Sequence, residues 1–275
     1  VPVSIISSTN TVCAGSSINL QATGALNYNW TPPIWINSTT SPNVIVTPNS
    51  SISYIVTGTD MNGCSNTDTI SLIVIQSLLM TSNPSSPSVC EGESVAISVS
   101  GASSYSWMPQ NGLNDPFAAN VLASPQVTTN YMVIGTDNFG CVDTTYVNVD
   151  VLAKPTIGLT NNPSICEGES VILSANGADN YDWYPSTGLN GIIGSTVVAN
   201  PSSSILYHVI GTSINGCSDT TSTVVSVNPN PTLIIFPLNT NICRGDTLSL
   251  HVNGAATYIW SPSAGLSASN IDTVQ

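Results

Sequence analysis

The sequence has 275 residues and a formal net charge of -13, with only 2 basic residues against 15 acidic ones. Charged residues make up 6% of the chain, whereas an ordinary soluble domain has about 25%. Nucleic acids and anionic membrane surfaces are recognised through clustered Lys and Arg, so this composition excludes them as partners. Because 41% of the residues are hydrophobic, we expect a folded chain whose polar surface comes from its 41 Ser, 30 Thr and 29 Asn.

A repeat of about 77 residues organises the whole chain. Its tryptophans are spaced by 77, 76 and 77 residues, with a Tyr two positions before each and a Pro two positions after. They are Trp30, Trp107, Trp183 and Trp260. The same period therefore predicts four units, which we call repeats 1 to 4: 1–76, 77–152, 153–229 and a truncated 230–275.

Repeat 4 has no segment corresponding to residues 201–227 of repeat 3. Half a sandwich would leave a sheet face and sheet edges without partners. We therefore expect the sequence to be a piece of a longer array. The absence of an initiator Met and of a leader segment agrees with a mature fragment.

The elements of one unit, taken in chain order, all favour β-strands. In repeat 3, Val171, Leu173 and Ala175 alternate with polar residues, which is typical of a half-buried strand. The Tyr-x-Trp strand follows, and Asn215-Gly216 then predicts a hairpin before a Thr-rich last strand. Short strands, frequent turns and a central Trp predict an all-β array of small immunoglobulin-like sandwiches. No apolar stretch is long enough to cross a bilayer, so we expect no membrane insertion.

Two stretches of repeat 3 resemble a known family. They read CEGESVILSANGADNYDWYPSTGL from residue 166 and YHVIGTSINGCSDTTSTVVSVNPNP from residue 207. These motifs are similar to the tandem PKD-like and Ig-like repeats of secreted surface proteins in Bacteroidetes-type bacteria, including gliding-motility-associated adhesins. The resemblance implies export to the cell surface by the type IX route and a stalk, filament or adhesin role. Its implied partners are neighbouring repeats, identical chains in a fibre, or surface glycans.

The seven cysteines indicate disulfides in an oxidising compartment, because they lack the grouping of a zinc site. One precedes each Trp by 17 residues, and in repeats 1 to 3 a second follows it by 34. They are Cys13, Cys64, Cys90, Cys141, Cys166, Cys217 and Cys243.

Two disulfide pairings stay open. Pairing within a unit joins Cys13 to Cys64, Cys90 to Cys141 and Cys166 to Cys217. In an immunoglobulin sandwich, however, the first cysteine would lie in the turn between strands A and B, at the opposite end from the F to G hairpin that holds the second. Pairing between consecutive units avoids this separation, and it joins Cys13 to Cys141 and Cys90 to Cys217.

Acidic and histidine residues give weak signals for an active or metal site. Glu91 with Glu93, and Glu167 with Glu169, could share one face of a strand and bind calcium, but a solvated turn explains them better. His208 and His251 lie in strands of different units, with no motif of a catalytic triad around them. We therefore expect no catalytic residues, no cofactor and no metal site beyond this weak calcium candidate.

Aromatic residues and threonines supply the remaining candidates. The repeated Trp residues belong to the core, whereas Trp35 occurs only in repeat 1, in place of the Gly of a Gly-Leu turn, and is a candidate contact residue. An Asp-Thr pattern resembles the O-glycosylation acceptor of the same bacteria. Its threonines are Thr69, Thr144, Thr220, Thr247 and Thr273.

Together these features predict a non-enzymatic segment of an extracellular surface protein. Its repeats would transmit load, and its disulfides would limit their extension. The alternative is a set of spacer or carbohydrate-binding modules in a large secreted hydrolase.

Overall fold

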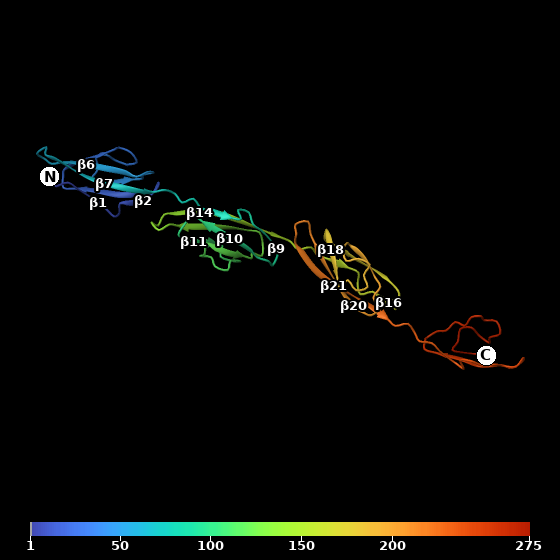
Figure 1. Cartoon of the computed structure of the whole chain (residues 1–275). Helices are drawn as coiled ribbons and strands as arrows, with labels where there is room; N and C mark the ends of the chain where they lie inside the picture. The colour runs from blue at the N-terminus through green and yellow to red at the C-terminus, as the bar shows by residue number, and fades with distance from the viewer. Residues whose placement is uncertain (1) are drawn as a thin grey trace. The chain divides into compact units, whose positions relative to one another are not determined.

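The computed structural model describes residues 2–275, and β-strands are the regular elements of that range. Two compact units, 1–153 and 154–275, divide the chain. Each is described by itself below (Figure 1). We keep the names repeats 1 to 4 for the four residue ranges predicted from the sequence.

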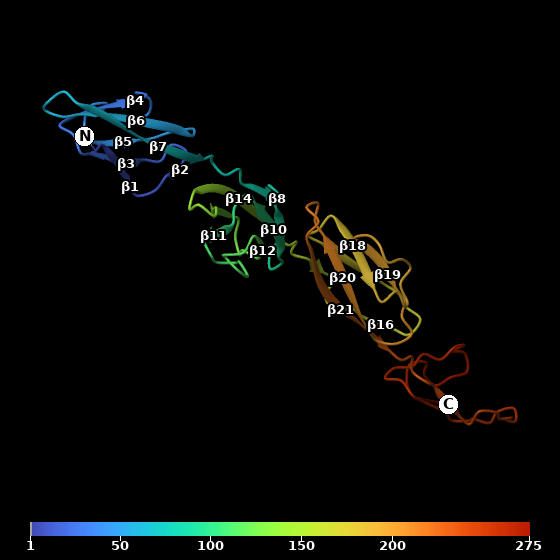
Figure 2. The same cartoon turned by 60° about the vertical axis from the view of Figure 1, so that its left-hand side comes forward.

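Repeat 1 is a sandwich of two sheets, and Figure 2 labels its strands. The three-stranded sheet is antiparallel, in the order β1-β3-β5. Its strands are β1 (Ser4–Ser7), β3 (Ile18–Thr23) and β5 (Asn43–Val46). The four-stranded sheet has the order β2-β7-β6-β4. Its strands are β2 (Thr11–Cys13), β4 (Asn27–Thr31), β6 (Ile52–Thr59) and β7 (Ser65–Ile75).

Repeat 2 has the same two sheets, with orders β12-β10-β8 and β11-β13-β14-β9. The three-stranded sheet contains β8 (Thr81–Asn83), β10 (Val95–Ser100) and β12 (Asn120–Ala123). The four-stranded sheet contains β9 (Ser88–Cys90), β11 (Ser104–Met108), β13 (Thr129–Thr136) and β14 (Val142–Leu152).

Repeat 3, in the second unit, has the sheet orders β15-β17-β19 and β16-β21-β20-β18. The first sheet contains β15 (Gly158–Leu159), β17 (Val171–Asn176) and β19 (Thr196–Ala199). The second contains β16 (Ser164–Cys166), β18 (Asn180–Tyr184), β20 (Ile205–Thr212) and β21 (Ser218–Asn228). Repeat 4 has one sheet, in the order β22-β23-β24. Its strands are β22 (Ile234–Phe236), β23 (Leu250–Asn253) and β24 (Thr273–Val274).

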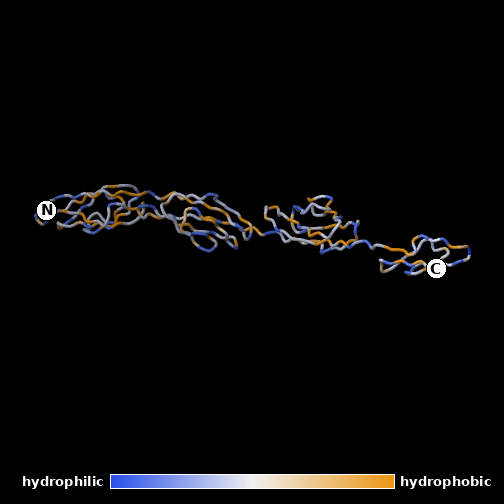
Figure 3. Tube along the Cα trace, turned by 60° about the horizontal axis from the view of Figure 1, so that its bottom comes forward, coloured by the Kyte–Doolittle hydropathy of each residue, from blue (hydrophilic) through white to orange (hydrophobic). Residues whose placement is uncertain are grey.

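Strand alternation builds the core of each complete repeat, because period-two apolar residues all point between the two sheets. Figure 3 shows hydrophobic and hydrophilic residues interspersed along the chain. The central Trp is buried as predicted, with Trp30 1% exposed, Trp107 0% and Trp183 2%. Its indole N–H is not left unpaired, because Nε1 donates to the carbonyl oxygen eleven residues later, as from Trp107 to Ala118 at 3.0 Å.

The start of each sandwich differs from the expectation in one respect. The sequence predicts that the first cysteine lies in the turn between strands A and B. In the structure, Cys13 instead ends the short strand β2, which has crossed to the other sheet and pairs in parallel with β7. Cys13 lies opposite Ile75, the last residue of β7, which continues into repeat 2. The first cysteine of repeat 1 therefore lies at the end from which the chain leaves.

Candidate functional site: the cysteine joint between repeats 1 and 2

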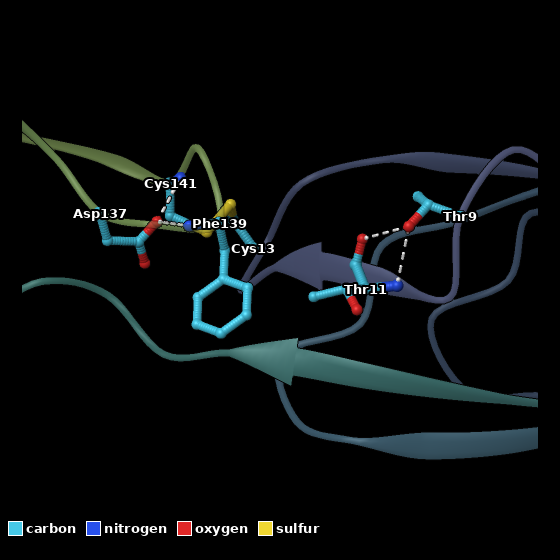
Figure 4. The surroundings of a disulfide bond; sticks show 6 residues. All are labelled: Thr9, Thr11, Cys13, Asp137, Phe139 and Cys141. Carbon is cyan, nitrogen blue, oxygen red and sulfur yellow. Dashed lines mark hydrogen bonds between the residues drawn. A yellow bond between two sulfur atoms is a disulfide. The ribbon is translucent and has the colours of Figure 1, made fainter.

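Repeats 1 and 2 are joined by a disulfide between Cys13 and Cys141, which are 128 positions apart in the sequence. Their Cα atoms are 5.6 Å apart, within the range that a disulfide spans without backbone movement. We call these two residues and their turns the cysteine joint (Figure 4).

The turn that carries Cys141 is organised by one carboxylate. Asp137 Oδ1 accepts hydrogen bonds from the backbone N–H groups of Phe139 and Cys141, both at 2.8 Å, as Figure 4 shows. The Asp137 N–H also donates to the Cys141 carbonyl oxygen at 3.0 Å. Gly140 has a φ of 85°, a backbone conformation that favours glycine. We call residues 137–141 and their counterparts the hairpin turn, because they connect β13 and β14.

The turn that carries Cys13 is fixed by backbone hydrogen bonds. Ala14 N–H donates to the Ile75 carbonyl oxygen at 2.9 Å, which extends the pairing of β2 with β7. Ser16 N–H donates to the Cys13 carbonyl oxygen at 3.0 Å, and Gly15 has a φ of 75°. We call residues 13–16 and their counterparts the Cys-Gly turn. Its sulfur is thereby held at the end of repeat 1 that leads into repeat 2.

Where the chain enters repeat 2, the backbone of Leu79 packs closely against Gly101. Gly101 has a φ of 106°, and a Cβ atom there would overlap the carbonyl oxygen of Leu79. Met80 packs against the core of repeat 2, while Leu79 is 82% exposed. Five residues, 76–80, separate β7 from β8. The two repeats are thus connected at one short linker and at one disulfide.

The structure resolves the choice of partner for Cys13. Cys13 pairs with Cys141, so the pairings of Cys13 with Cys64 and of Cys90 with Cys141 are wrong. The pairing of Cys166 with Cys217 is also wrong, because Cys166 is a free thiol. Pairing within a unit fails because the Cys-Gly turn and the hairpin turn of one sandwich lie at opposite ends.

The remaining cysteines fall into two groups. Cys90 and Cys217 are disulfide-bonded, and their pairing with each other stays a prediction from the repeat register. Free thiols are found at Cys64, Cys166 and Cys243, and all three are exposed.

The acidic residues of the Cys-Gly turns stay at the surface. Glu91, Glu93, Glu167 and Glu169 are all exposed. Glu169 Oε2 accepts a hydrogen bond from the backbone N–H of Cys166 at 3.0 Å, so this carboxylate stabilises its own turn. Among residues 2–275, no group of three or more His, Cys, Asp and Glu side chains could hold a metal ion.

The two histidines take part in cross-strand pairs. His251 Nδ1 is 2.8 Å from Thr273 Oγ1, and the two residues are direct partners between β23 and β24. His208 stacks on Tyr184 with ring centroids 4.9 Å apart, and these residues are also direct partners, between β20 and β18. Such pairs are the ordinary stabilising contacts of a sheet.

Trp35 occupies a position that glycine fills in the other repeats. Its φ is 56°, and the corresponding Gly112 and Gly188 have φ values of 80° and 74°. The Trp35 carbonyl oxygen accepts from Thr47 N–H at 2.9 Å, as the Gly112 carbonyl does from Ser124 at 2.7 Å. A large side chain at a positive φ is uncommon and costs backbone energy. The half-buried Trp35 thus stays a candidate contact residue.

The candidate glycosylation residues divide by environment. Thr144 and Thr220 occupy the same repeat position, and Thr69 lies two residues further along its strand. All three are exposed, and the preceding Asp in each case accepts from the Thr backbone N–H at 2.8 to 2.9 Å. Thr247 is exposed outside any strand. Thr273 is half-buried against His251, so its hydroxyl is already engaged.

Sequence reasoning missed the hairpin-turn carboxylate. Its signal was present as a recurring Asp-x-x-Gly-Cys, in Asp60-Met61-Asn62-Gly63-Cys64 and its counterpart at 137–141, with Ser213 replacing the Asp in repeat 3. Asp60 and Asp137 each accept from two backbone N–H groups of their own turn, whereas Ser213 Oγ donates to the Cys217 carbonyl oxygen at 3.2 Å.

Comparison with known proteins supports the fold. Residues 153–231 match a family model described as "Ig-like domain CHU_C associated". No curated protein sequence matches the chain. Residues 2–275 include no helix long and apolar enough to cross a membrane.

Several solved tandem immunoglobulin structures are similar at low identity. An I-band fragment from titin has 12% identity and a TM-score of 0.38, covering 82% of this chain and 98% of the fragment. The three N-terminal domains of the highly immunogenic outer capsid protein of bacteriophage RB49 have 14% identity and a TM-score of 0.36, covering 82% and 99%. The N-terminal eight Ig domains of Down Syndrome Cell Adhesion Molecule have 15% identity and a TM-score of 0.29, covering 92% and 45%.

The family match assigns residues 153–231 to an immunoglobulin-like domain. Repeats 1 and 2 share its two sheets and strand order. The chain is therefore an all-β protein of tandem immunoglobulin-like domains.

Proposed function

We propose that this chain is a non-enzymatic segment of a bacterial extracellular surface protein, in which the tandem domains act as a stalk, filament or adhesin. The observation that carries the proposal is the cysteine joint. It links consecutive domains covalently at their ends, which serves to transmit force and has no evident use in catalysis. A disulfide also needs an oxidising compartment, which favours a location outside the cytoplasm.

The outer surface supports the same role. The chain has only two basic residues, Lys154 and Arg244, so a partner that binds through negative charge has little to contact. Neighbouring repeats, identical chains in a fibre and surface glycans are the partners that such a neutral surface suits. The resemblance of repeat 3 to Bacteroidetes-type surface proteins favours export by the type IX route.

Immunogold labelling tests the location. An antibody raised against the purified chain should label thin fibres on intact cells of the source bacterium, and a strain lacking the gene is the control. Labelling that appears only after the cells are permeabilised would refute a surface role. The alternative, a spacer or carbohydrate-binding module of a secreted hydrolase, requires a hydrolytic domain in the same native polypeptide, which mass spectrometry of the purified surface protein would reveal.

Force spectroscopy tests the mechanical role. When the chain is pulled from its two ends, the joint keeps the residues between Cys13 and Cys141 out of the path of the force. In a Cys90→Ser, Cys217→Ser background, which removes the other disulfide-bonded cysteines, reduction should therefore release roughly 420 to 460 Å of additional length, since 128 positions extend by about 3.3 to 3.6 Å each. In the same background, Cys13→Ser should show this length without reductant, and Cys64→Ser, at a free exposed thiol, should behave as the unchanged background. Equal extension with and without reductant would contradict the role of the joint.

Intact mass spectrometry tests the proposed glycosylation. In material purified from the source bacterium, we expect mass above the polypeptide value, located at Thr69, Thr144 and Thr220. The bare polypeptide mass would exclude it. Thr273 should stay unmodified in either case, because its hydroxyl already contacts His251.

A further inference from the structure

We propose that the outer face of the sheet β1-β3-β5 in repeat 1 is a binding site for a neutral, hydroxyl-rich polysaccharide. A groove of about 570 Å³ lies on this face, and we call it the amide groove. The proposal rests on the surface role for its biological setting, and it adds the site, the residues and the class of ligand.

The amide groove crosses three neighbouring strands, which Figure 2 labels in repeat 1. Ile6, Gln21 and Asn43 are direct partners across β1, β3 and β5. Asn19 and Ile45 are direct partners two positions away on β3 and β5. These side chains point outward, because the alternate residues of β3 and β5 are buried in the core. The floor of the groove thus combines three amides with two aliphatic side chains.

The amides of the groove are available to a ligand. The exposed side chains of Asn19, Gln21 and Asn43 make no hydrogen bond to another residue within 2–275. Each amide offers a donor NH₂ group and an acceptor oxygen. A sugar hydroxyl group likewise donates and accepts, and neighbouring hydroxyl groups on one chain could bind several of these amides together. The groove therefore matches the hydrogen-bonding pattern of a polysaccharide.

Charge restricts the ligand to an uncharged one. None of the described residues that line the amide groove is charged. A ligand with carboxylate, sulfate or phosphate groups would meet no Lys or Arg there, and the net charge of -13 would repel it. Ile6 and Ile45, which are 54% and 45% exposed, can pack against the C–H groups of a sugar ring. Three amides make the floor too polar for the core of a protein interface, which favours a glycan over a protein partner.

The central strand of this sheet distinguishes repeat 1 from the other complete repeats. Asn19 and Gln21 carry the two amides of β3. The residues at the same repeat positions are Ala96 and Ser98 in β10 and Ile172 and Ser174 in β17. All three strands have the same place in their sheets, so the fold does not require an amide at either position. Repeats 2 and 3 therefore supply matched controls within the same chain.

Trp35 lies at the edge of the same sheet. Its carbonyl oxygen accepts from Thr47 N–H at 2.9 Å, and Ile36 bridges to Val46 of β5. The chain at 35–36 thus continues the sheet beyond β5. The face of an indole ring attracts the C–H groups of a sugar ring, so Trp35 would contact a polysaccharide that extends past the groove.

Affinity electrophoresis of the purified full chain tests the ligand class. Native gels are cast with one of four neutral polysaccharides (dextran, laminarin, mannan or xylan) or with the acidic polygalacturonate. We expect at least one neutral polymer to retard the chain relative to an inert marker protein, and polygalacturonate to have no effect. Retardation by none of the neutral polymers would overturn the site, and equal retardation by polygalacturonate would overturn the neutral class. The stalk role would survive either result, because it rests on the cysteine joint.

The source of the polysaccharide is distinguished in the same gels. Neutral polysaccharide extracted from the surface of the source bacterium is compared with the four foreign polymers. Stronger retardation by the extract would identify a glycan of the same cells as the ligand, whereas stronger retardation by a foreign polymer would identify a target of adhesion. Dimerisation without polysaccharide that is lost with the groove amides, seen by sedimentation, would instead assign the face to a second copy and overturn the proposal.

Substitution in β3 tests the groove itself. The double variant Asn19→Ala, Gln21→Ser gives β3 the residues of repeat 2, and it should weaken binding at least about tenfold because hydrogen bonds to the ligand are lost. The matched control Ser98→Ala, at the position of Gln21 in repeat 2, should bind as the wild type. Unchanged binding in the double variant, or an equal loss in Ser98→Ala, would overturn the assignment of the site.

Two further measurements complete the test. Exposed strand positions should tolerate these changes, and hydrogen exchange of repeat 1 checks that the double variant is folded. If it loses protection, Gln21→Ser alone replaces it, with a loss of binding of severalfold expected. Trp35→Ala should also weaken binding of the polymer severalfold, and unchanged binding would contradict the extension of the site to Trp35.

Discussion

Repeats 3 and 4 carry the same local contacts with very different burial. In both, the indole Nε1 of the repeated Trp donates to a carbonyl oxygen eleven residues later at 2.9 Å, from Trp183 to Gly194 and from Trp260 to Ile271. Yet Trp183 is 2% exposed, whereas Trp260 is only half-buried. The local contacts therefore form with one sheet, but burial of the Trp requires the second sheet.

The Tyr two residues before the Trp shows the same difference between local contacts and burial. Tyr181 Oη contacts the N and O atoms of Ala178 at 2.7 and 2.8 Å, and Tyr258 does so with Ala255 at 3.0 and 2.6 Å. Tyr181 is 5% exposed in repeat 3, whereas Tyr258 in repeat 4 borders an apolar groove of about 230 Å³ together with Val252 and Trp260. Hydrogen bonds between residues close in sequence thus form without a second sheet. Most of the burial of these aromatic side chains requires it.

The largest expected effect is on the stability of repeat 3 when its Trp is truncated. Trp183→Ala should lower the free energy of unfolding of repeat 3 by about 3 to 5 kcal/mol, because it leaves a cavity between two sheets. Trp260→Ala should cost much less, since no second sheet covers that side chain. Hydrogen exchange followed by mass spectrometry resolves the two repeats separately. Equal losses of protection would mean that repeat 4 buries its Trp as fully as repeat 3 does.

A smaller effect should be shared by both repeats. Gly177 and Gly254 have φ values of 96° and 110°, and a Cβ at either would overlap a carbonyl oxygen, of Thr156 and Thr232 respectively. Gly177→Ala and Gly254→Ala should therefore each destabilise their own repeat, by more than about 1 kcal/mol. Urea unfolding monitored by hydrogen exchange measures both.

The control for this prediction is Gly168→Ala. Gly168 also has a positive φ, of 90°, but an added Cβ meets nothing within 4 Å. Gly168→Ala therefore measures the free-energy cost of a positive φ without any overlap of the added Cβ. If Gly168→Ala destabilises repeat 3 as much as Gly177→Ala does, the contact with the Thr156 carbonyl is not responsible.

The smallest effect concerns alkaline pH and is confined to the complete repeats. Burial raises the pKa of Tyr54, Tyr131 and Tyr207 above 10.0, the ordinary value for tyrosine. The unfolded chain then loses these protons at lower pH than the folded chain, so stability is fully present below pH 10.0 and falls as the pH rises through the folded pKa.

The variant Tyr207→Phe isolates this effect in repeat 3. It should cost about 1 kcal/mol at neutral pH, because the hydroxyl group donates to the Thr187 carbonyl oxygen at 2.6 Å. It should also flatten the loss of stability of repeat 3 above pH 10, as measured by unfolding at several pH values. An unchanged alkaline slope would show that this phenol does not titrate with unfolding.

Much of the fold could be predicted from the sequence, because the signals are local. Alternation in 171–175 predicted a strand, the 77-residue period predicted equivalent tryptophans, and all three in complete repeats are buried. The crossing of the first strand to the second sheet could not be predicted. β2 has only three residues, and its position depends on parallel pairing with β7, more than fifty residues later.

The cysteine joint could be predicted only as one of two alternatives. Spacing identifies which cysteines are equivalent, but pairing depends on which end of a sandwich each turn occupies. The role of Asp137 was missed because its effect comes from two hydrogen bonds within the hairpin turn, which no charge pattern reveals. The role of Trp35 as a contact residue stays a prediction, and the structure adds that its backbone φ is 56°.

The scarcity of basic residues has a consequence for proteolysis. A trypsin-like protease cuts after Lys or Arg, and Lys154 is followed by the buried Pro155, a bond that such enzymes do not cut. Arg244 lies in the exposed Cys-Gly turn of repeat 4 and provides the one remaining site. Digestion in an environment rich in such enzymes would therefore remove the stretch after residue 244 in a single cut and leave repeats 1 to 3 intact.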